Sequence, residues 1–168
     1  MTISGWRIPI ALGATGAAGV AISIYLTTVH YAKAPLVCSS SGVVNCERVL
    51  SSGYSSVFGV PISLGGIVWF AVLAALGLAT LLRTPEPLWL QPAQVAWGFL
   101  GLLAVIYLIG VEALALGVLC AWCTALHLLI VTALVLTIVR TPRLPAVEPS
   151  PAGARRGPLS RGAAQQGR

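Results

Sequence analysis

The segment 119–139, LCAWCTALHLLIVTALVLTIV, joins two closely spaced cysteines to a long apolar run that contains one histidine. A helix rises about 1.5 Å per residue and the hydrocarbon core of a bilayer is about 30 Å thick, so a run of this length can span a membrane. Cys120, Cys123 and His127 would lie in the first turns of that helix. The segment therefore predicts a transmembrane helix with two thiols at one end, which could form a metal site, a structural pair or a redox-active dithiol.

The composition of the whole chain is that of a membrane protein. Of its 168 residues, 57% are hydrophobic and only 8% are charged, a balance that a soluble domain could not cover with water-facing side chains. Backbone groups in lipid must form hydrogen bonds within the chain, which favours helices over other structures. The predicted fold class is an all-α membrane protein, a four-helix transmembrane bundle. The predicted spans are 8–29, 62–82, 95–116 and 119–139.

A long loop and a tail complete the predicted organisation. The outer loop 30–61, between the first and second helices, is expected to be partly helical and to press its second half onto the bundle. Within it, Asn45 is placed to cap a short helix over Cys46–Leu50. Residues 1–141 would form the four-helix domain. Residues 142–168 are rich in proline, glycine, alanine and arginine without periodicity, which predicts a disordered, basic cytoplasmic tail.

The basic residues predict the orientation of the bundle, because cytoplasmic loops carry an excess of lysine and arginine. If the N-terminus is cytoplasmic, only Lys33 and Arg48 lie outside. The net charge of +6 is then a topology signal, and nucleic-acid binding is not expected because the tail lacks aromatic residues for base stacking. A cleaved signal peptide is disfavoured, because the first apolar run of about twenty residues exceeds the usual signal core. The basic residues that fall inside are Arg7, Arg83, Arg140, Arg143 and the later arginines of the tail.

The glycines of the first span have two interpretations. Gly13, Gly16 and Gly19 in GATGAAG resemble part of a dinucleotide-binding loop, but such a loop needs a preceding strand and an exposed helix start. Small residues at this spacing let transmembrane helices approach closely. We therefore interpret the glycines as a packing face within the bundle.

All four cysteines fall on the predicted outer side, where oxidising conditions favour disulfide chemistry. A zinc site built from Cys38, Cys46, Cys120 and Cys123 is disfavoured, because the two loop cysteines are more widely spaced than usual zinc ligands. A disulfide between Cys120 and Cys123 would close a very small ring and restrain little chain entropy. Redox use is therefore favoured over a metal site or a structural bond. A lipid-soluble quinone could reach such a site, whereas no nicotinamide-binding loop is present.

The order of these features resembles the vitamin K epoxide reductase family, specifically its bacterial quinone-linked members. The features are a cysteine pair in the outer loop, the segment SSVFGVP at 55–61, and CAWC at the start of the last helix. The resemblance covers roughly 8–139. It implies a protein of the bacterial cytoplasmic membrane and a quinone (menaquinone, ubiquinone or vitamin K) as electron acceptor. The basic residues predict that both termini are cytoplasmic.

The resemblance also implies roles for the cysteines. Cys120 and Cys123 would be the active pair that faces the quinone, and Cys38 and Cys46 the shuttle pair. The shuttle pair would receive electrons from a thioredoxin-like dithiol protein acting in trans, and no metal is implied. The resulting prediction is a membrane thiol-disulfide oxidoreductase that supports disulfide bond formation. The alternatives are net reduction of a vitamin K quinone or epoxide, and a noncatalytic membrane subunit with structural disulfides.

The predicted quinone contacts are Ser55, Phe58, Glu112, Trp122 and His127. Ser55 and His127 stand where animal members have an asparagine and a tyrosine. For His127, a hydrogen bond to a quinone and a packing role with a bond to a carbonyl are both open.

Glu112 is the only carboxylate within a predicted span. Ionisable groups inside a membrane are costly and often functional. For this side chain, proton handling and a structural hydrogen bond, to Tyr107 or to a helix end, are both open.

Overall fold

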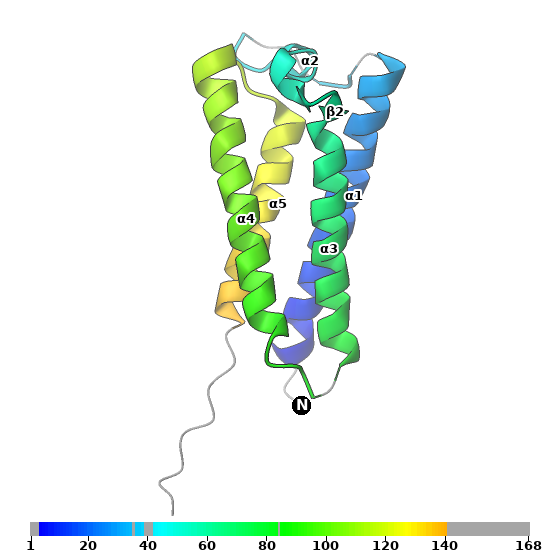
Figure 1. Ribbon diagram of the computed structural model, residues 1–168, viewed down its shortest axis with the longest axis vertical. Helices are drawn as coiled ribbons and strands as arrows, with labels where there is room; N and C mark the ends of the chain where they lie inside the picture. The colour runs from blue at the N-terminus through cyan, green and yellow to red at the C-terminus, as the bar shows by residue number, and fades with distance from the viewer. Residues whose placement is uncertain (1–3, 35, 39–41, 84, 141–168) are drawn as a thin grey trace, which may run out of the picture.

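The structure, a computed structural model, describes residues 4–34, 36–38, 42–83 and 85–140. The predicted tail 142–168 lies outside the described residues. Four of the helices are long and apolar enough to cross a membrane, which confirms the predicted all-α transmembrane bundle (Figure 1). The helices are α1 (Ser4–Ala32), α2 (Cys46–Leu50), α3 (Ile62–Leu82), α4 (Leu90–Gly110) and α5 (Ala121–Val139), with a 3-10 turn η1 (Gly53–Ser55), a π-helical segment η2 (Val111–Leu116), and the strands β1 (Ser56–Val57) and β2 (Val60–Pro61).

The third span begins earlier than the predicted range 95–116. Helix α4 starts at Leu90, and Pro92 lies in its first turn. The first N–H groups of a helix have no partner within it, so a proline there removes no hydrogen bond. Trp97 consequently lies inside the helix, where its indole N–H donates to the Trp69 carbonyl at 3.0 Å.

Close packing of α1 against α3 is built on glycine. A Cβ atom on Gly16 would lie 2.8 Å from the backbone nitrogen of Ala74, and one on Gly19 would lie 2.1 Å from the ring of Phe70. The Cβ direction of Gly13 is open, but its backbone is approached by Gly77. Helices in lipid associate through such contacts, because burying apolar surface brings no gain when the solvent is equally apolar.

The interior of the bundle is small, and much of the remaining apolar surface faces outward. Large apolar side chains such as Leu78, Leu103 and Val135 are exposed along the long helices, as expected for side chains in contact with lipid. The buried cluster draws on all four long helices and consists of Leu12, Phe70, Leu73, Val105, Ile130 and Ala133.

A polar network joins three helices at the end of the bundle where α5 finishes. The Arg140 guanidinium donates to Gln94 Oε1 at 2.9 Å and to Thr80 Oγ1 at 3.3 Å, and it forms an ion pair with Glu86. The fully buried Gln94 amide in turn donates to the Leu76 carbonyl at 3.0 Å. These bonds fix α3, α4 and α5 relative to one another at this end.

The opposite end is covered by the loop between α1 and α3 (Figure 1). As predicted, α2 spans Cys46–Leu50, and Asn45 Oδ1 accepts the Arg48 N–H at 2.9 Å. Strands β1 and β2 then form a hairpin that the sequence did not predict. Its turn residues Phe58 and Gly59 have φ angles of 52° and 80°, the positive values that a tight two-residue hairpin turn requires.

Candidate active site

Backbone pairing holds the outer loop against the start of α5. The Asn45 N–H donates to the Leu119 carbonyl at 2.9 Å, and the Leu119 N–H donates to the Val43 carbonyl at 2.9 Å. The next residue of each segment is a cysteine, and both are buried, with 1% of Cys46 and none of Cys120 exposed. The pairing therefore holds the segment that carries Cys46 against the segment that carries Cys120, the N-cap residue of α5.

The segment that carries the other loop cysteine is also fixed to α5. The Trp122 indole N–H donates to the Val37 carbonyl at 3.0 Å, and Tyr25 Oη accepts the Val37 N–H at 3.3 Å. The Tyr25 and Trp122 rings lie 5.1 Å apart. Cys38 follows directly and forms a disulfide with Cys46. All four cysteines are thereby gathered at one end of the bundle.

The two cysteines of α5 have different surroundings. Cys120 is the N-cap residue, and its Sγ accepts the Cys123 N–H at 3.3 Å, whereas Cys123 is only half-buried. The Cys123 side chain hydrogen-bonds the Cys120 thiol and lowers the pKa of Cys120, against the opposing effect of burial. A thiolate at Cys120 is thus favoured by donors at the helix start, as expected for a reactive cysteine at a helix N-terminus.

Glu112 lies on the π-helical segment that precedes these cysteines. The segment ends at Gly117, whose φ of 65° turns the chain back, and the Gly117 and Val118 N–H groups both donate to the Glu112 carbonyl. The buried Glu112 carboxylate accepts the Cys120 N–H at 3.2 Å. A hydrogen bond to a helix end is therefore present, whereas Tyr107 is exposed.

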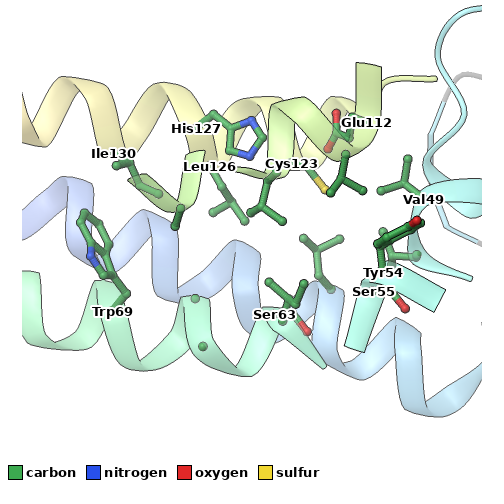
Figure 2. Close-up of a pocket in the computed structure, with 18 of the residues that line it drawn as sticks. Val49, Tyr54, Ser55, Ser63, Trp69, Glu112, Cys123, Leu126, His127 and Ile130 are labelled. Carbon is green, nitrogen blue, oxygen red and sulfur yellow. The ribbon is translucent and has the colours of Figure 1, made fainter. Parts of the chain in front are cut away.

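A cavity of about 350 Å³ opens next to Cys123, between the long helices and beneath the outer loop. Figure 2 shows Cys123, His127 and Glu112 on one wall, facing Tyr54, Ser55 and Ser63. Apart from these groups the lining is mostly apolar. Its deeper part is formed by Trp69, Phe70, Gly101, Ala104, Leu126 and Ile130.

Comparison with known protein families gives one result. Residues 10–138 match the model of the vitamin K epoxide reductase family. The chain belongs to the vitamin K epoxide reductase family. It is accordingly a multi-pass membrane protein with a thiol-disulfide oxidoreductase kind of activity. No match was found among curated proteins.

In this vitamin K epoxide reductase family member, two of the five predicted quinone contacts lie outside the cavity. Phe58 occupies the hairpin turn with a positive φ angle, and its side chain is fully exposed. Trp122 packs on Tyr25 and bonds the loop, so it positions the Cys38 segment. The cavity is lined by Ser55, Glu112 and His127 among the predicted contacts, together with Cys123.

His127 faces the cavity with a buried imidazole ring (Figure 2). Within the described part of the chain, no protein group forms a hydrogen bond with this ring, so the packing interpretation with a bond to a carbonyl is not realised. Its nitrogens remain available to a molecule in the cavity.

Sequence reasoning missed Trp69, Tyr54 and Ser63 as lining residues. The Trp69 indole nitrogen is buried without a hydrogen-bond partner. Of the five tryptophans, Trp69 is the one well inside a predicted span and away from the helix ends, where amphipathic rings are usual. That position in the sequence could have identified Trp69 as a candidate site residue. Nothing in the sequence indicated Tyr54 or Ser63, because their position at the cavity depends on how the loop folds over the bundle.

Proposed function

We propose that this protein oxidises a dithiol protein and passes the electrons through Cys38–Cys46 and then Cys120–Cys123 to a quinone. One observation carries the proposal: Cys123 opens on the cavity, whereas its partner Cys120 is buried beside the loop that holds Cys46. Each sulfur of the active pair thus meets a different reaction partner. This division is what a relay between a protein dithiol and a small acceptor requires.

The cavity residues fit a quinone ring. The volume of about 350 Å³ falls in the usual range for small-molecule sites, which are apolar with a few placed polar groups. His127 and the unpartnered Trp69 indole N–H are such groups, and both can donate to a carbonyl oxygen. When bound, the quinone supplies a sink for two electrons and two protons. Menaquinone, ubiquinone and vitamin K are the candidates.

The proposed exchange proceeds by thiolate attack on disulfides. A thioredoxin-like protein acting in trans reduces the Cys38–Cys46 bond. The Cys46 thiolate attacks Cys120 of an oxidised Cys120–Cys123 pair, which releases Cys123 as a thiolate. Attack of Cys38 on Cys46 then restores the loop disulfide and leaves the active pair reduced.

We further propose a bacterial cytoplasmic membrane protein with cytoplasmic termini and the cysteines on the outer face. Arg83 and Arg140 lie at the end of the bundle away from the outer loop. This distribution agrees with the excess of basic residues on the cytoplasmic side of membrane proteins.

Purified protein in detergent, supplied with a reduced thioredoxin-like protein and a soluble menaquinone or ubiquinone analogue, tests the function. We expect dithiol oxidation with stoichiometric quinol formation, and none in the Cys123→Ser variant. The Cys120→Ser variant should also fail to turn over, but its free Cys123 should give a new absorbance band when the quinone analogue is added. If both variants still oxidise the dithiol, the CAWC pair is structural and the proposal is wrong. Turnover only with vitamin K epoxide would favour the reductase alternative.

A further inference from the structure

Glu112 is a buried carboxylate with no cation beside it in the described part of the chain. Only 3% of the residue is exposed, and the one ion pair among the described residues joins Arg140 and Glu86 at the other end of the bundle. Keeping an unpaired carboxylate in an apolar environment is costly. The buried position of Glu112 therefore needs a physical explanation.

The hydrogen bond to the Cys120 N–H does not supply that reason. A neutral amide or hydroxyl oxygen would accept the same N–H with a smaller desolvation cost. What the carboxylate adds is a proton-accepting atom at the cavity wall. Figure 2 shows the Glu112 carboxylate next to Cys123 on the same wall of the cavity, which both residues line.

We propose that Glu112 is the proton acceptor for the Cys123 thiol, an inference that rests on the proposed function of the same site. When the Cys123 S–H bond breaks, the proton moves to the Glu112 carboxylate and the electron pair stays on sulfur as a thiolate. The charge of the pair remains −1 throughout, so no second negative charge develops in the apolar cavity.

The overall reaction then balances. Cys120 and Cys123 form an S–S bond, two electrons pass to the quinone, and two thiol protons follow them. One of these protons travels through Glu112, which ends as a carboxylate ready for the next turnover. The hydrogen bond from the Cys120 N–H holds the acceptor over the start of α5.

Alkylation of Cys123 tests this role without any quinone. In a Cys120→Ser background with the loop disulfide intact, Cys123 is the only free thiol, and N-ethylmaleimide can reach it through the cavity. The rate is measured at one neutral pH by mass spectrometry of the intact protein. Replacing Glu112 with Gln keeps an oxygen for the backbone N–H of residue 120 but removes the proton acceptor. General-base catalysis contributes about 10²–10⁴-fold in enzymes, and we expect at least a tenfold fall here.

Two other results for the alkylation rate are possible. An unchanged rate in Glu112→Gln would mean that the side chain only holds the helix start, and a faster rate would mean that its charge merely opposes the thiolate. Either outcome overturns the proposal. Glu47→Gln is the matched control, because it removes an exposed carboxylate from the same end of the protein and should not change the rate.

A second variant guards against loss of folding. Should Glu112→Gln not fold, as judged by gel filtration and circular dichroism, Glu112→Asp decides. The Asp side chain is one methylene shorter, so its carboxylate lies farther from Cys123. If the carboxylate accepts the proton, alkylation is slower in this variant; if it does not, the rate in the folded protein is unchanged. Because the assay contains no quinone, its result is independent of whether quinone-linked dithiol oxidation is found.

Discussion

Gly16→Ala perturbs a close contact between the backbones of α1 and α3. The added Cβ would lie 2.8 Å from the nitrogen and Cβ of Ala74 and 2.9 Å from its Cα. Ordinary carbon contacts are about 3.5–4.0 Å, so α1 and α3 must separate by roughly 0.7 Å or more. No side-chain rotation relieves this clash, because two of the three atoms belong to the backbone.

The expected cost follows from two opposing effects. Overpacking a tight interior costs about 1–3 kcal/mol, whereas alanine gains about 1 kcal/mol over glycine in helix propensity. Gly13→Ala in the same helix gains the propensity alone, because nothing lies within 4 Å of its new Cβ. The two variants should therefore differ by about 1–3 kcal/mol in unfolding free energy, with Gly16→Ala less stable. Unfolding by sodium dodecyl sulfate in mixed micelles measures this difference. Equal stability of the two variants would refute the proposed packing of α1 on α3.

Three further predictions concern the site end of the bundle. Gly117→Ala should destabilise the protein by roughly 1–2 kcal/mol in the same assay, because Gly117 has a left-handed conformation, and Gly117→Asn should cost less; equal costs would show that this conformation is not required. His127→Phe should lower quinone reduction and leave exchange with the dithiol partner intact, since it removes ring nitrogens from the cavity and no sulfur; a matching loss of exchange would contradict this role. In reduced, right-side-out vesicles, a membrane-impermeant thiol reagent should label the loop cysteines Cys38 and Cys46, and labelling only after permeabilisation would reverse the proposed orientation.

The membrane architecture was predictable because its signals are local. Each signal is contained in a short stretch of sequence. The signals are the apolar runs long enough to span a bilayer, the turn residues between them, and Asn45 before Cys46. The exact starts of the helices were harder to predict from the sequence, because a proline such as Pro92 occurs both in connections and in the first turn of a helix.

The candidate site was only partly predictable. The sequence places the cysteines at one end, and the helical spacing of Cys123 and His127 places both on one face. Which other side chains line a cavity depends on how segments far apart in the chain meet. Trp122 and Phe58 stand in motifs that suggest quinone contact, yet the first bonds Val37 and the second occupies a hairpin turn. The quinone-binding roles of Ser55, Glu112 and His127 remain predictions.

The route of the electrons between the two pairs can be measured directly by trapping the bond that joins them. In Cys123→Ser the Cys120 thiolate should attack the loop disulfide, and in Cys38→Ser the Cys46 thiolate should attack the oxidised active pair. Non-reducing peptide mapping should find the same Cys46–Cys120 bond in both variants, because backbone pairing holds the segments that carry these two residues against each other. A Cys38–Cys120 bond in the first variant, or a Cys46–Cys123 bond in the second, would contradict the proposed relay.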